Sequence, residues 1–423
     1  MELCLADGSR ICIIGGGPAG SLSAMHLLQF ARQKGIHLDI TIFEPRDHTA
    51  LGPRGCKGCA GILSTRMLNG LATLELSLPK EVIQSELHSY SVHVDGDIIQ
   101  IRQPDTRRRI ASVYRGGGPH LLTGEPPASL DRYLLSQACV RGARLVQSCV
   151  TKVTNEKLPV VSTSRESYPA DLIVLATGVS SNNPLASSFR YRRPLTEIMV
   201  QDEVLRPESW PSDDVNVYLK QPSGMIFGVL TPKGRCLNVS LLGHGLTQDA
   251  VTRFIDSLKI GPDQPALVGL CGCAPRIAIR PAKNFFGDRW VAVGDAAVSR
   301  LYKDGIGSAF FTAKTAMRVA VSDGITKRAF QKGYLPYCNS IAADNLYGRL
   351  LFWLWEITLK TPFLLEGWKR AVLSEMQFPP EQRIHMRILW GMLTGDEPYK
   401  DLAFLFLKRP AIRGMWIGFR QAI

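Results

Sequence analysis

The residues whose spacing points most directly to chemistry are three glycines near the start of the chain. Gly15, Gly17 and Gly20 follow the apolar run from Ile11 to Ile14 in the pattern G-x-G-x-x-G. In this pattern the first glycine permits a tight turn out of a strand. The second lets a diphosphate approach the backbone, and the third lets a helix pack closely on the strand. The spacing therefore predicts the phosphate-binding turn of a dinucleotide site.

The residues around this turn complete a β-α-β unit. Pro18 and Ala19 begin a helical pattern that runs to about Gln33, whose N-terminal N–H groups and partial positive charge suit a phosphate. A second strand is expected from Leu38 to Phe43. Glu44 at its end would accept hydrogen bonds from the ribose hydroxyls of an adenosine. Because strand, helix, strand and acid come in this order, the unit favours dinucleotide binding over a chance glycine-rich turn.

A membrane span is the alternative for the same stretch, because Ile11 to Ala31 contains no Asp, Glu, Lys or Arg. Three consecutive glycines and a proline in its first half favour the nucleotide interpretation. The chain also lacks the layout of a signal peptide, in which positive charge precedes an apolar run.

Two further segments would approach such a cofactor. Asp295 follows a short buried strand expected from Trp290 to Val293, and the Gly305-Ile306-Gly307 turn leads into a helix expected from Ser308 to about Ser322. A carboxylate at the end of a buried strand suits a sugar-like hydroxyl, and a Gly-x-Gly turn suits close approach of a polar ring. An ordinary strand–turn–helix is the alternative.

Two arginines have both a functional and a surface interpretation. Arg46, two residues after Glu44, would contact an adenosine phosphate or remain a surface charge. Arg115 lies in a glycine-rich turn before a helix expected from Ser129 to Arg141, and it would reach the cofactor or be exposed.

The cysteines offer a different chemistry. Cys56 and Cys59 form a C-x-x-C in an irregular glycine-rich loop, and the other close pair is Cys271 and Cys273. The first pair could be a redox dithiol, half of a zinc site or two unrelated thiols. A structural zinc would require the two pairs to meet in space, and no metal is expected.

The amino-acid composition limits the size, the compartment and the kinds of binding partner to be expected. The 423 residues are 45% hydrophobic and 21% charged, as in a globular protein of two or three domains. Ten cysteines at irregular spacing do not resemble a secreted disulfide framework, so we expect reduced thiols in a cytoplasmic protein. The net charge of +13 and the run Arg107–Arg109 suit a solvated face, an anionic membrane surface or an acidic substrate. No nucleic-acid-binding motif is present, so nucleic acid is the least favoured partner.

The C-terminal third contains four apolar, aromatic-rich stretches punctuated by Lys and Arg. They are 346–355, 364–372, 384–393 and 402–407, and each is shorter than the roughly 20 apolar residues of a membrane span. We expect core helices that cap a substrate cavity. Peripheral contact with an anionic membrane at the cytoplasmic face is the alternative.

Three motifs in this order resemble a known group of flavoproteins. They are GGGPAG at 15–20, the ATG turn at 176–178 and VAVGDAA at 291–297. Together they resemble the FAD-dependent group that contains p-hydroxybenzoate hydroxylase and the geranylgeranyl reductases. Within it, CAGILS at 59–64 resembles the Cys-Gly-x-x-x-Ser loop of geranylgeranyl reductases. Leu130-Asp131 resembles the start of their Phe-Asp helix.

The resemblance implies a cofactor and a fold. It implies FAD held by Gly15, Gly17, Gly20, Glu44 and Asp295, with the flavin ring beside 305–307 and Cys59 as a candidate proton donor. The implied fold is α/β: a Rossmann-type FAD-binding domain with a parallel sheet, an inserted antiparallel substrate sheet and a helical C-terminal region. The expected division is FAD-binding parts at 1–72, 111–192 and 273–324, strands towards the substrate domain at 73–110, the substrate sheet at 193–272 and helices at 325–423.

One segment departs from the reductase pattern. Those enzymes often carry Tyr-x-Trp-x-Phe-Pro in the substrate sheet, whereas this chain has FGVLTP at 227–232, which keeps the proline and few aromatics. The favoured function is nevertheless reduction of a carbon–carbon double bond in an apolar or lipid-like substrate. A flavin monooxygenase and a non-catalytic flavin-binding adaptor are the alternatives. Because only one complete dinucleotide fingerprint is present, an external donor such as NAD(P)H or ferredoxin would supply the electrons.

Overall fold

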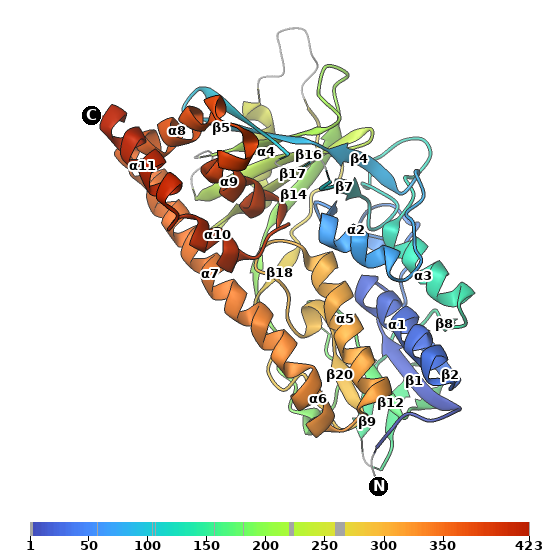
Figure 1. Ribbon diagram of the computed structural model, residues 1–423. Helices are drawn as coiled ribbons and strands as arrows, with labels where there is room; N and C mark the ends of the chain where they lie inside the picture. The colour runs from blue at the N-terminus through green and yellow to red at the C-terminus, as the bar shows by residue number, and fades with distance from the viewer. Residues whose placement is uncertain are drawn as a thin grey trace.

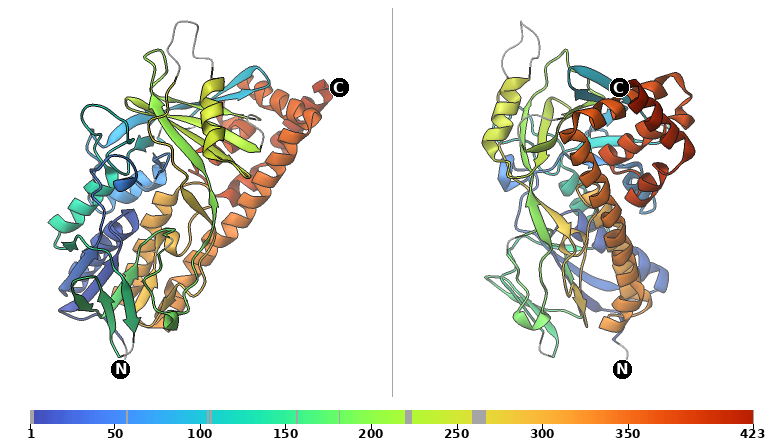
Figure 2. Two further views of the ribbon diagram at one scale, coloured as in Figure 1. Left: turned by 180° about the vertical axis from the view of Figure 1, so that it is seen from behind. Right: turned by 90° about the vertical axis from the view of Figure 1, so that its left-hand side faces the viewer.

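The computed structural model describes residues 3–56, 58–103, 105, 107–155, 157–180, 182–219, 224–258 and 267–422, with 421 and 422 described by their backbone alone. The molecule is elongated, with an α/β unit at one end and a large mixed sheet at the other (Figure 1). A long helix, α7 (Leu335–Lys360), runs along the molecule between the two ends (Figures 1 and 2).

The α/β unit is built on a six-stranded sheet in the order β19-β20-β12-β1-β2-β8. Strands β20, β12, β1, β2 and β8 are parallel, and β19 pairs antiparallel with β20. The strands are β1 (Ser9–Ile14), β2 (Leu38–Phe43), β8 (Arg144–Val146), β12 (Leu172–Leu175), β19 (Phe286–Gly287) and β20 (Trp290–Ala292). Residues 11–14 and 172–175 are buried throughout, as expected for strands covered on both faces.

Three helices accompany this sheet. They are α1 (Pro18–Lys34), α3 (Leu130–Val140) and α5 (Gly305–Ser322), and α1 packs between the other two. The β1–α1–β2 unit therefore forms as predicted. The membrane-span interpretation of Ile11 to Ala31 is wrong, because the stretch is a strand, a glycine turn and a helix. Within the described residues, no helix is both long and apolar enough to cross a membrane.

The second large sheet has the order β14-β17-β16-β15-β5-β6. All its pairings are antiparallel except β15 with β5, which is parallel. Its strands are β5 (Ser89–Val94), β6 (Asp97–Arg102), β14 (Val200–Leu205), β15 (Asp214–Tyr218), β16 (Met225–Lys233) and β17 (Cys236–Gly243). The fold class predicted from the sequence is confirmed, with one parallel pairing added.

Helix α4 (Gln248–Ser257) covers the back of this sheet and was not predicted. Val251 and Phe254 pack there against Leu230 and Val239. The apolar residues recur at helical spacing between polar ones, but the surrounding strand-like runs masked this pattern.

Two strand-forming runs of the sequence are each split between two sheets. The run from Glu86 to Val94 breaks at His88, where β4 (Ile83–Leu87) ends and β5 begins. The run from Leu145 to Val153 breaks after Val146, and the chain resumes in another sheet as β9 (Lys152–Asn155). At His88 the backbone N–H donates to the carbonyl of Asp213, so the chain pairs with a new neighbour there.

The remaining strands form small sheets, and two short helices connect the larger units. The small sheets are β3-β7-β4, β9-β10-β11 and β13-β18. Their further strands are β3 (Ile62–Leu63), β7 (Ile110–Val113), β10 (Pro159–Ser162), β11 (Ser167–Pro169), β13 (Leu195–Ile198) and β18 (Arg276–Arg280), and the short helices are α2 (Thr65–Ala72) and α6 (Lys327–Gly333).

The C-terminal helices cover the front of the second sheet. After α7 they are α8 (Pro362–Ser374), α9 (Ile384–Thr394), α10 (Tyr399–Leu405) and α11 (Arg409–Ala422). Trp390 of α9 packs edge-on against Tyr90 of β5, with ring centroids 5.3 Å apart, and Phe352 of α7 stacks near Phe227 of β16. These stretches are therefore packed helices, as predicted.

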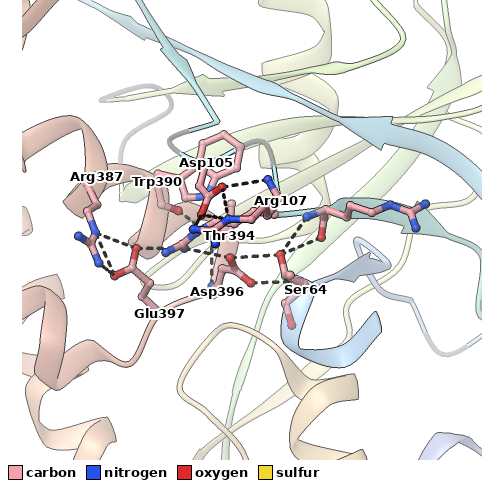
Figure 3. A network of polar contacts seen from close by, with 12 residues as sticks. Ser64, Asp105, Arg107, Arg387, Trp390, Thr394, Asp396 and Glu397 are labelled. Atoms are coloured by element: carbon pink, nitrogen blue, oxygen red, sulfur yellow. Dashed lines mark hydrogen bonds and ion pairs between the residues drawn. The ribbon is translucent and has the colours of Figure 1, made fainter. Parts of the chain in front are cut away.

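A buried ionic network joins these helices to the loop before β7 (Figure 3). Arg108 lies 3.0 Å from both Asp396 and Glu397, whose side chains are 4% and 8% exposed, and Arg387 pairs with Glu397 at 2.8 Å. On either side of Arg108, Arg107 pairs with Asp105 and Arg109 pairs with Glu86. The Arg107–Arg109 run thus makes intramolecular ion pairs instead of the free basic patch that the sequence suggested.

Candidate functional site

A cavity of about 650 Å³ extends from the glycine turn of the α/β unit to the front of the second sheet. Nine of the residues predicted to act at the site line it: Gly17, Pro18, Ala19, Arg46, Cys59, Arg115, Asp295, Gly305 and Ile306. The other four, Gly15, Gly20, Glu44 and Gly307, are not among the lining residues. The structure therefore brings residues from separate stretches of sequence to one cavity.

The glycine turn is shaped by two close backbone approaches. Gly15 has φ +106°, and a Cβ there would lie against the carbonyl of Ala176 at the end of β12. A Cβ at Gly20 would overlap the carbonyl oxygen of Gly15. At Gly17 the nearest atom to an added Cβ would be Arg115 Nη2 at 3.5 Å, an ordinary contact. Gly15 and Gly20 therefore shape the turn, whereas Gly17 faces the space of the cavity.

Glu44 is held at the end of β2 by the backbone around it. Its Oε2 accepts from the Gly16 N–H at 2.8 Å, and its Oε1 accepts from the Arg46 N–H at 3.0 Å. The carboxylate is 5% exposed, and His48 Nε2 lies 3.9 Å away. Two backbone donors therefore orient this carboxylate beside the glycine turn.

Two arginines flank the same turn. Arg115 makes a bidentate pair with Asp131, with Nη2 to Oδ2 at 2.8 Å and Nε to Oδ1 at 3.0 Å. Its side chain is 18% exposed, so the exposed alternative for Arg115 is wrong. Arg46 Nη1 is a buried donor without a hydrogen-bond partner among the described residues. Because a buried donor costs free energy unless it is paired, Arg46 is poised for an acceptor from a ligand.

Asp295 and the first turn of α5 form the opposite wall. A Cβ at Gly305 would lie 3.8 Å from Asp295 Oδ1, so the carboxylate stands beside the start of the helix. Helix α5 begins at Gly305, three residues before the predicted Ser308. An earlier start brings the Gly305-Ile306-Gly307 turn into the helix itself.

Asp304 caps this helix, and the sequence analysis had not singled it out. Its backbone is left-handed, with φ +54°, and its carboxylate lies where a Cβ at Gly307 would overlap it. Ser64, the last residue of the 59–64 motif, donates to Asp304 Oδ1 at 3.1 Å. Burial raises the pKa of Asp304 to about 6. An ionisable side chain therefore lies beside the N-terminus of α5, where the helix dipole is positive. The sequence analysis expected only the Gly-x-Gly turn there.

Cys59 lies on the cavity wall, in the loop before β3. Its Sγ accepts from the Gly61 N–H at 3.2 Å, and its carbonyl accepts from Lys233 Nζ at 3.3 Å. Cys56, Cys271 and Cys273 line the same cavity, so the two cysteine pairs do approach each other. Burial raises the pKa of Cys56, and it raises the pKa of Cys273 to about 12. Across the described part of the chain, no three His, Cys, Asp or Glu side chains are placed to hold a metal ion.

Lys303 is a second candidate for acid–base chemistry that the sequence did not reveal. It lines the cavity, with Nζ 5.0 Å from the ring centroid of Phe227. Burial lowers its pKa to about 8. The only sequence signal was its position in the 302–307 stretch, because its burial depends on the C-terminal helices: a Cβ added at Gly395, just after α9, would lie 2.7 Å from Lys303 Cβ.

Comparison with solved structures identifies the fold. No protein-family model matches the chain, and no curated protein matches it in sequence. A geranylgeranyl bacteriochlorophyll reductase-like protein from Thermoplasma acidophilum matches 99% of this chain and 100% of its own, at 15% identity and a TM-score of 0.61. The chain has the Rossmann-type fold of the FAD-dependent oxidoreductases.

Two other solved structures share this fold. A single-residue variant of HpxO from Klebsiella pneumoniae, solved with FAD, matches 94% of this chain and 99% of its own, at 18% identity and a TM-score of 0.60. The p-nitrophenol 4-monooxygenase PnpA from Pseudomonas putida matches 81% and 89%, at 13% identity and a TM-score of 0.53. This FAD-oxidoreductase fold therefore serves both reductase-like proteins and monooxygenases, and the fold alone does not choose between them.

The residues present fit an FAD molecule. The space above Gly17 would accommodate a diphosphate, and Arg46 Nη1 offers the unpaired buried donor described above. The cavity volume is within the range of roughly 300–1,000 Å³ that small-molecule and cofactor sites occupy.

Proposed function

We propose that the protein is an FAD-dependent oxidoreductase that reduces a carbon–carbon double bond in an apolar or lipid-like substrate. The observation that supports this most is the shared cavity. It joins the dinucleotide-binding turn to the front face of a sheet that carries Phe227, Val229 and Leu242. A cofactor and an apolar substrate would thus share one cavity.

In this proposal, the chain's residues would hold FAD from one end to the other. Glu44 and Arg46 would bind the adenosine end, and the Gly17 backbone with Arg115 would bind the diphosphate. Asp131 would fix the Arg115 guanidinium, because a bidentate carboxylate sets both its position and its orientation. Asp295 would accept from the ribityl hydroxyls, and Gly305 and Ile306 would border the flavin ring.

Bound FAD, once reduced, supplies the hydride for such a reaction. The chain must then provide a proton for the second carbon and keep water away. Cys59, expected from the sequence, and Lys303, added by the structure, both line the cavity. Leu393 and Thr394 of α9 close the same cavity, which supports the expectation that the C-terminal helices cap it. Either donor would recover its proton from solvent after product release.

A flavin monooxygenase is the second candidate, since the same fold carries a monooxygenase in a solved relative. Polar side chains on the cavity face of the second sheet would suit a polar product of such a reaction. A flavin-binding adaptor without turnover is the third candidate.

The fate of the reduced protein separates these candidates. After anaerobic photoreduction, the protein is offered a panel of isoprenoid and aryl alkenes, and products are identified by mass spectrometry. We expect alkene reduction without oxygen and slow reoxidation in air. Hydroxylated product formed in step with oxygen uptake would favour the monooxygenase, and the absence of any product would favour the adaptor.

The electron donor in this proposal is external, either NAD(P)H or ferredoxin. The support is that the sequence contains one complete dinucleotide fingerprint, which the FAD would occupy. Stopped-flow reduction by each donor would identify it, and reduction by neither would contradict this part of the proposal.

We also propose that the C-terminal helices contact an anionic membrane at the cytoplasmic face, from which a lipid-like substrate would enter. Support comes from large exposed apolar residues: Leu346, Leu350, Trp353 and Leu354 on α7, and Ile412 and Trp416 on α11. Those on α7 recur at helical spacing and so share one face. Exposed Lys408, Arg409 and Arg413 stand in the same region, and their charge complements an anionic surface.

A further inference from the structure

The cavity face of the second sheet changes from apolar to polar along the strands. The pairing register places side chains there in three rows. The first row is Phe227 and Leu242, the second is Val229, Ser240 and Gln201, and the third is Thr231, Asn238 and Glu203. All of these residues line the cavity and are buried. Polarity therefore rises from row to row toward Glu203.

Hydrogen bonds run through the polar rows in one direction. Gln201 Nε2 donates to Ser240 Oγ at 2.7 Å, and Ser240 Oγ donates to Asn238 Oδ1 at 2.6 Å. Asn238 Nδ2 then donates to Glu203 Oε1 at 3.5 Å. The chain of hydrogen bonds thus leads from row to row within the sheet. The last group in this chain of hydrogen bonds is the Glu203 carboxylate, which can only accept.

The second oxygen of that carboxylate has no partner in the described part of the chain. Glu203 Oε2 and Thr231 Oγ1 are both buried polar atoms without a hydrogen bond, and Thr231 is 0% exposed. Both residues belong to the same row of the sheet and line the cavity. An unpaired buried polar atom costs about 1–3 kcal/mol, a cost that a hydrogen bond from a ligand would offset.

The charge of Glu203 is already compensated. Lys233 Nζ lies 2.8 Å from Glu203 Oε1, 3.3 Å from the Cys59 carbonyl oxygen and 4.0 Å from the ring centroid of Tyr114. Burial alone would lower the pKa of Lys233, but the Glu203 carboxylate outweighs it and the pKa is raised. Because the pair is neutral overall, a cationic ligand group would gain little, whereas a neutral donor would satisfy Glu203 Oε2.

We propose that the substrate is an elongated apolar molecule with a neutral hydroxyl or N–H group at one end, which donates to Glu203 Oε2 and contacts Thr231 Oγ1. The apolar body lies along Val229 toward Phe227 and Leu242. Four residues of strand separate Thr231 from Phe227, or roughly 13 Å at about 3.3 Å per residue, which sets the length of that body. This inference rests on the proposed function for the use of the cavity and adds the substrate class.

The test compares alcohols with their methyl ethers, which differ only in the donated hydrogen and one methyl group. The probes are geraniol with geranyl methyl ether, and 4-hexylphenol with 4-hexylanisole. Each is titrated into the FAD-loaded protein by isothermal titration calorimetry, which needs no flavin signal. We expect each alcohol to bind roughly 5- to 20-fold more tightly than its ether.

Variants of Glu203 and Thr231 locate the effect. In Glu203→Gln, Lys233 would hold the amide oxygen and leave the amide nitrogen, which is a donor, at the position of Oε2, so the alcohol preference should fall to less than about threefold. Thr231→Val keeps the shape of the side chain and breaks no hydrogen bond of the protein, so it should fold normally and weaken both members of a pair alike, because the alcohol and ether oxygens can both accept from Thr231 Oγ1. Thr231→Ser should keep both affinities. Thr154→Val, on β9 and outside the cavity lining, is the matched control and should change nothing.

Three results would overturn the proposal: no binding of either alcohol, equal binding of alcohol and ether, or a preference that survives Glu203→Gln. Unchanged binding of both members of a pair in Thr231→Val would also contradict it, since Thr231 Oγ1 would then make no contact with the ligand. Failure of the proposed function is recognised separately, because it appears as missing flavin or missing reduction whatever the ligand preference.

Discussion

Cys59 is one of the two candidate proton donors in the proposed reaction. We expect Cys59→Ser to slow substrate reduction about 100-fold, the lower end of what a general acid contributes, because a serine hydroxyl is a far weaker acid than a thiol. FAD content and reduction by dithionite should be unchanged. Single-turnover kinetics under anaerobic conditions would measure the effect.

The matched control is Cys56→Ser, which lies in the same loop and should have little effect. Equal loss in both variants would indicate a dithiol function for the pair. Full activity in Cys59→Ser would mean that the proton comes from another group or from water, and Lys303 is the group to test. The rate would then fall as pH rises through about 8, where the lowered pKa of Lys303 places its loss of charge.

Residues that act through local spacing could be predicted from the sequence, and those that act through distant contacts could not. Gly15, Gly17 and Gly20 do their work within one turn, so their pattern carries the information. The Glu203–Lys233 pair depends on strand register, because the two residues meet across 30 positions of sequence through β17. Nothing in the local sequence of either residue indicates this meeting.

At the scale of elements, the first turn of α5 makes stability depend on pH through Asp304. Its pKa is raised from 3.8 to about 6, so the folded state favours the protonated form. Stability present below about pH 4 is therefore lost as pH rises through 6. We expect the free energy of unfolding of the protein, relative to Asp304→Asn, to fall by on the order of 1–3 kcal/mol between about pH 4 and 7.

Urea unfolding of both proteins across this pH range would measure the difference. Asp47→Asn is the control of opposite sign, because hydrogen bonds from Thr49 lower the pKa of Asp47. The free energy of unfolding of the protein relative to Asp47→Asn should rise as pH rises toward about 4 and stay nearly flat between about pH 4 and 7. A difference between the protein and Asp304→Asn that stays flat with pH would contradict the assignment of Asp304.

Element boundaries show where local patterns are insufficient. The β1–α1–β2 unit was predicted closely because the apolar run, the glycine turn, the helix, the second strand and the final acid follow one another in a fixed order along the chain. The breaks after Leu87 and Val146 have no local signal in the sequence, since strand-forming residues continue on both sides and only the pairing partner changes. Which sheet a strand joins is decided by tertiary packing.

At the scale of the whole molecule, Arg108 ties the C-terminal helices to the rest of the protein through its ion pairs with Asp396 and Glu397. Arg108→Ala would leave Asp396 buried without its partner and Glu397 with Arg387 alone. We expect a loss of about 3 kcal/mol in the free energy of unfolding, because an uncompensated buried carboxylate is costly. Urea denaturation would measure it.

Arg107→Ala is the neighbouring control, since the Arg107 side chain is 89% exposed and its ion pair should contribute little. Similar losses in the two variants would show that Arg108 is no more important than a surface charge. The sequence showed three adjacent arginines but not their carboxylate partners, two of which lie far along the chain, on the segment after α9.

The exposed apolar face of the C-terminal helices predicts membrane binding of a particular kind. We expect co-sedimentation with vesicles of anionic phospholipid, which falls steeply as salt rises, and weaker binding to neutral vesicles. Trp353→Ser should reduce binding, whereas Leu195→Ser, a similarly exposed apolar residue on β13, should not. Binding to neither vesicle would leave the face without this function.

The most direct test of the account is the FAD content of the purified protein, measured by absorbance before and after heat release and by mass spectrometry of the released cofactor. The account predicts about one FAD per chain. It also predicts that Gly17→Val folds but contains almost none, because an added Cβ makes only an ordinary contact with Arg115 while its branches would occupy the diphosphate space. A folded wild-type protein that takes up no flavin from excess FAD, or a Gly17→Val variant with full FAD content, would contradict the account.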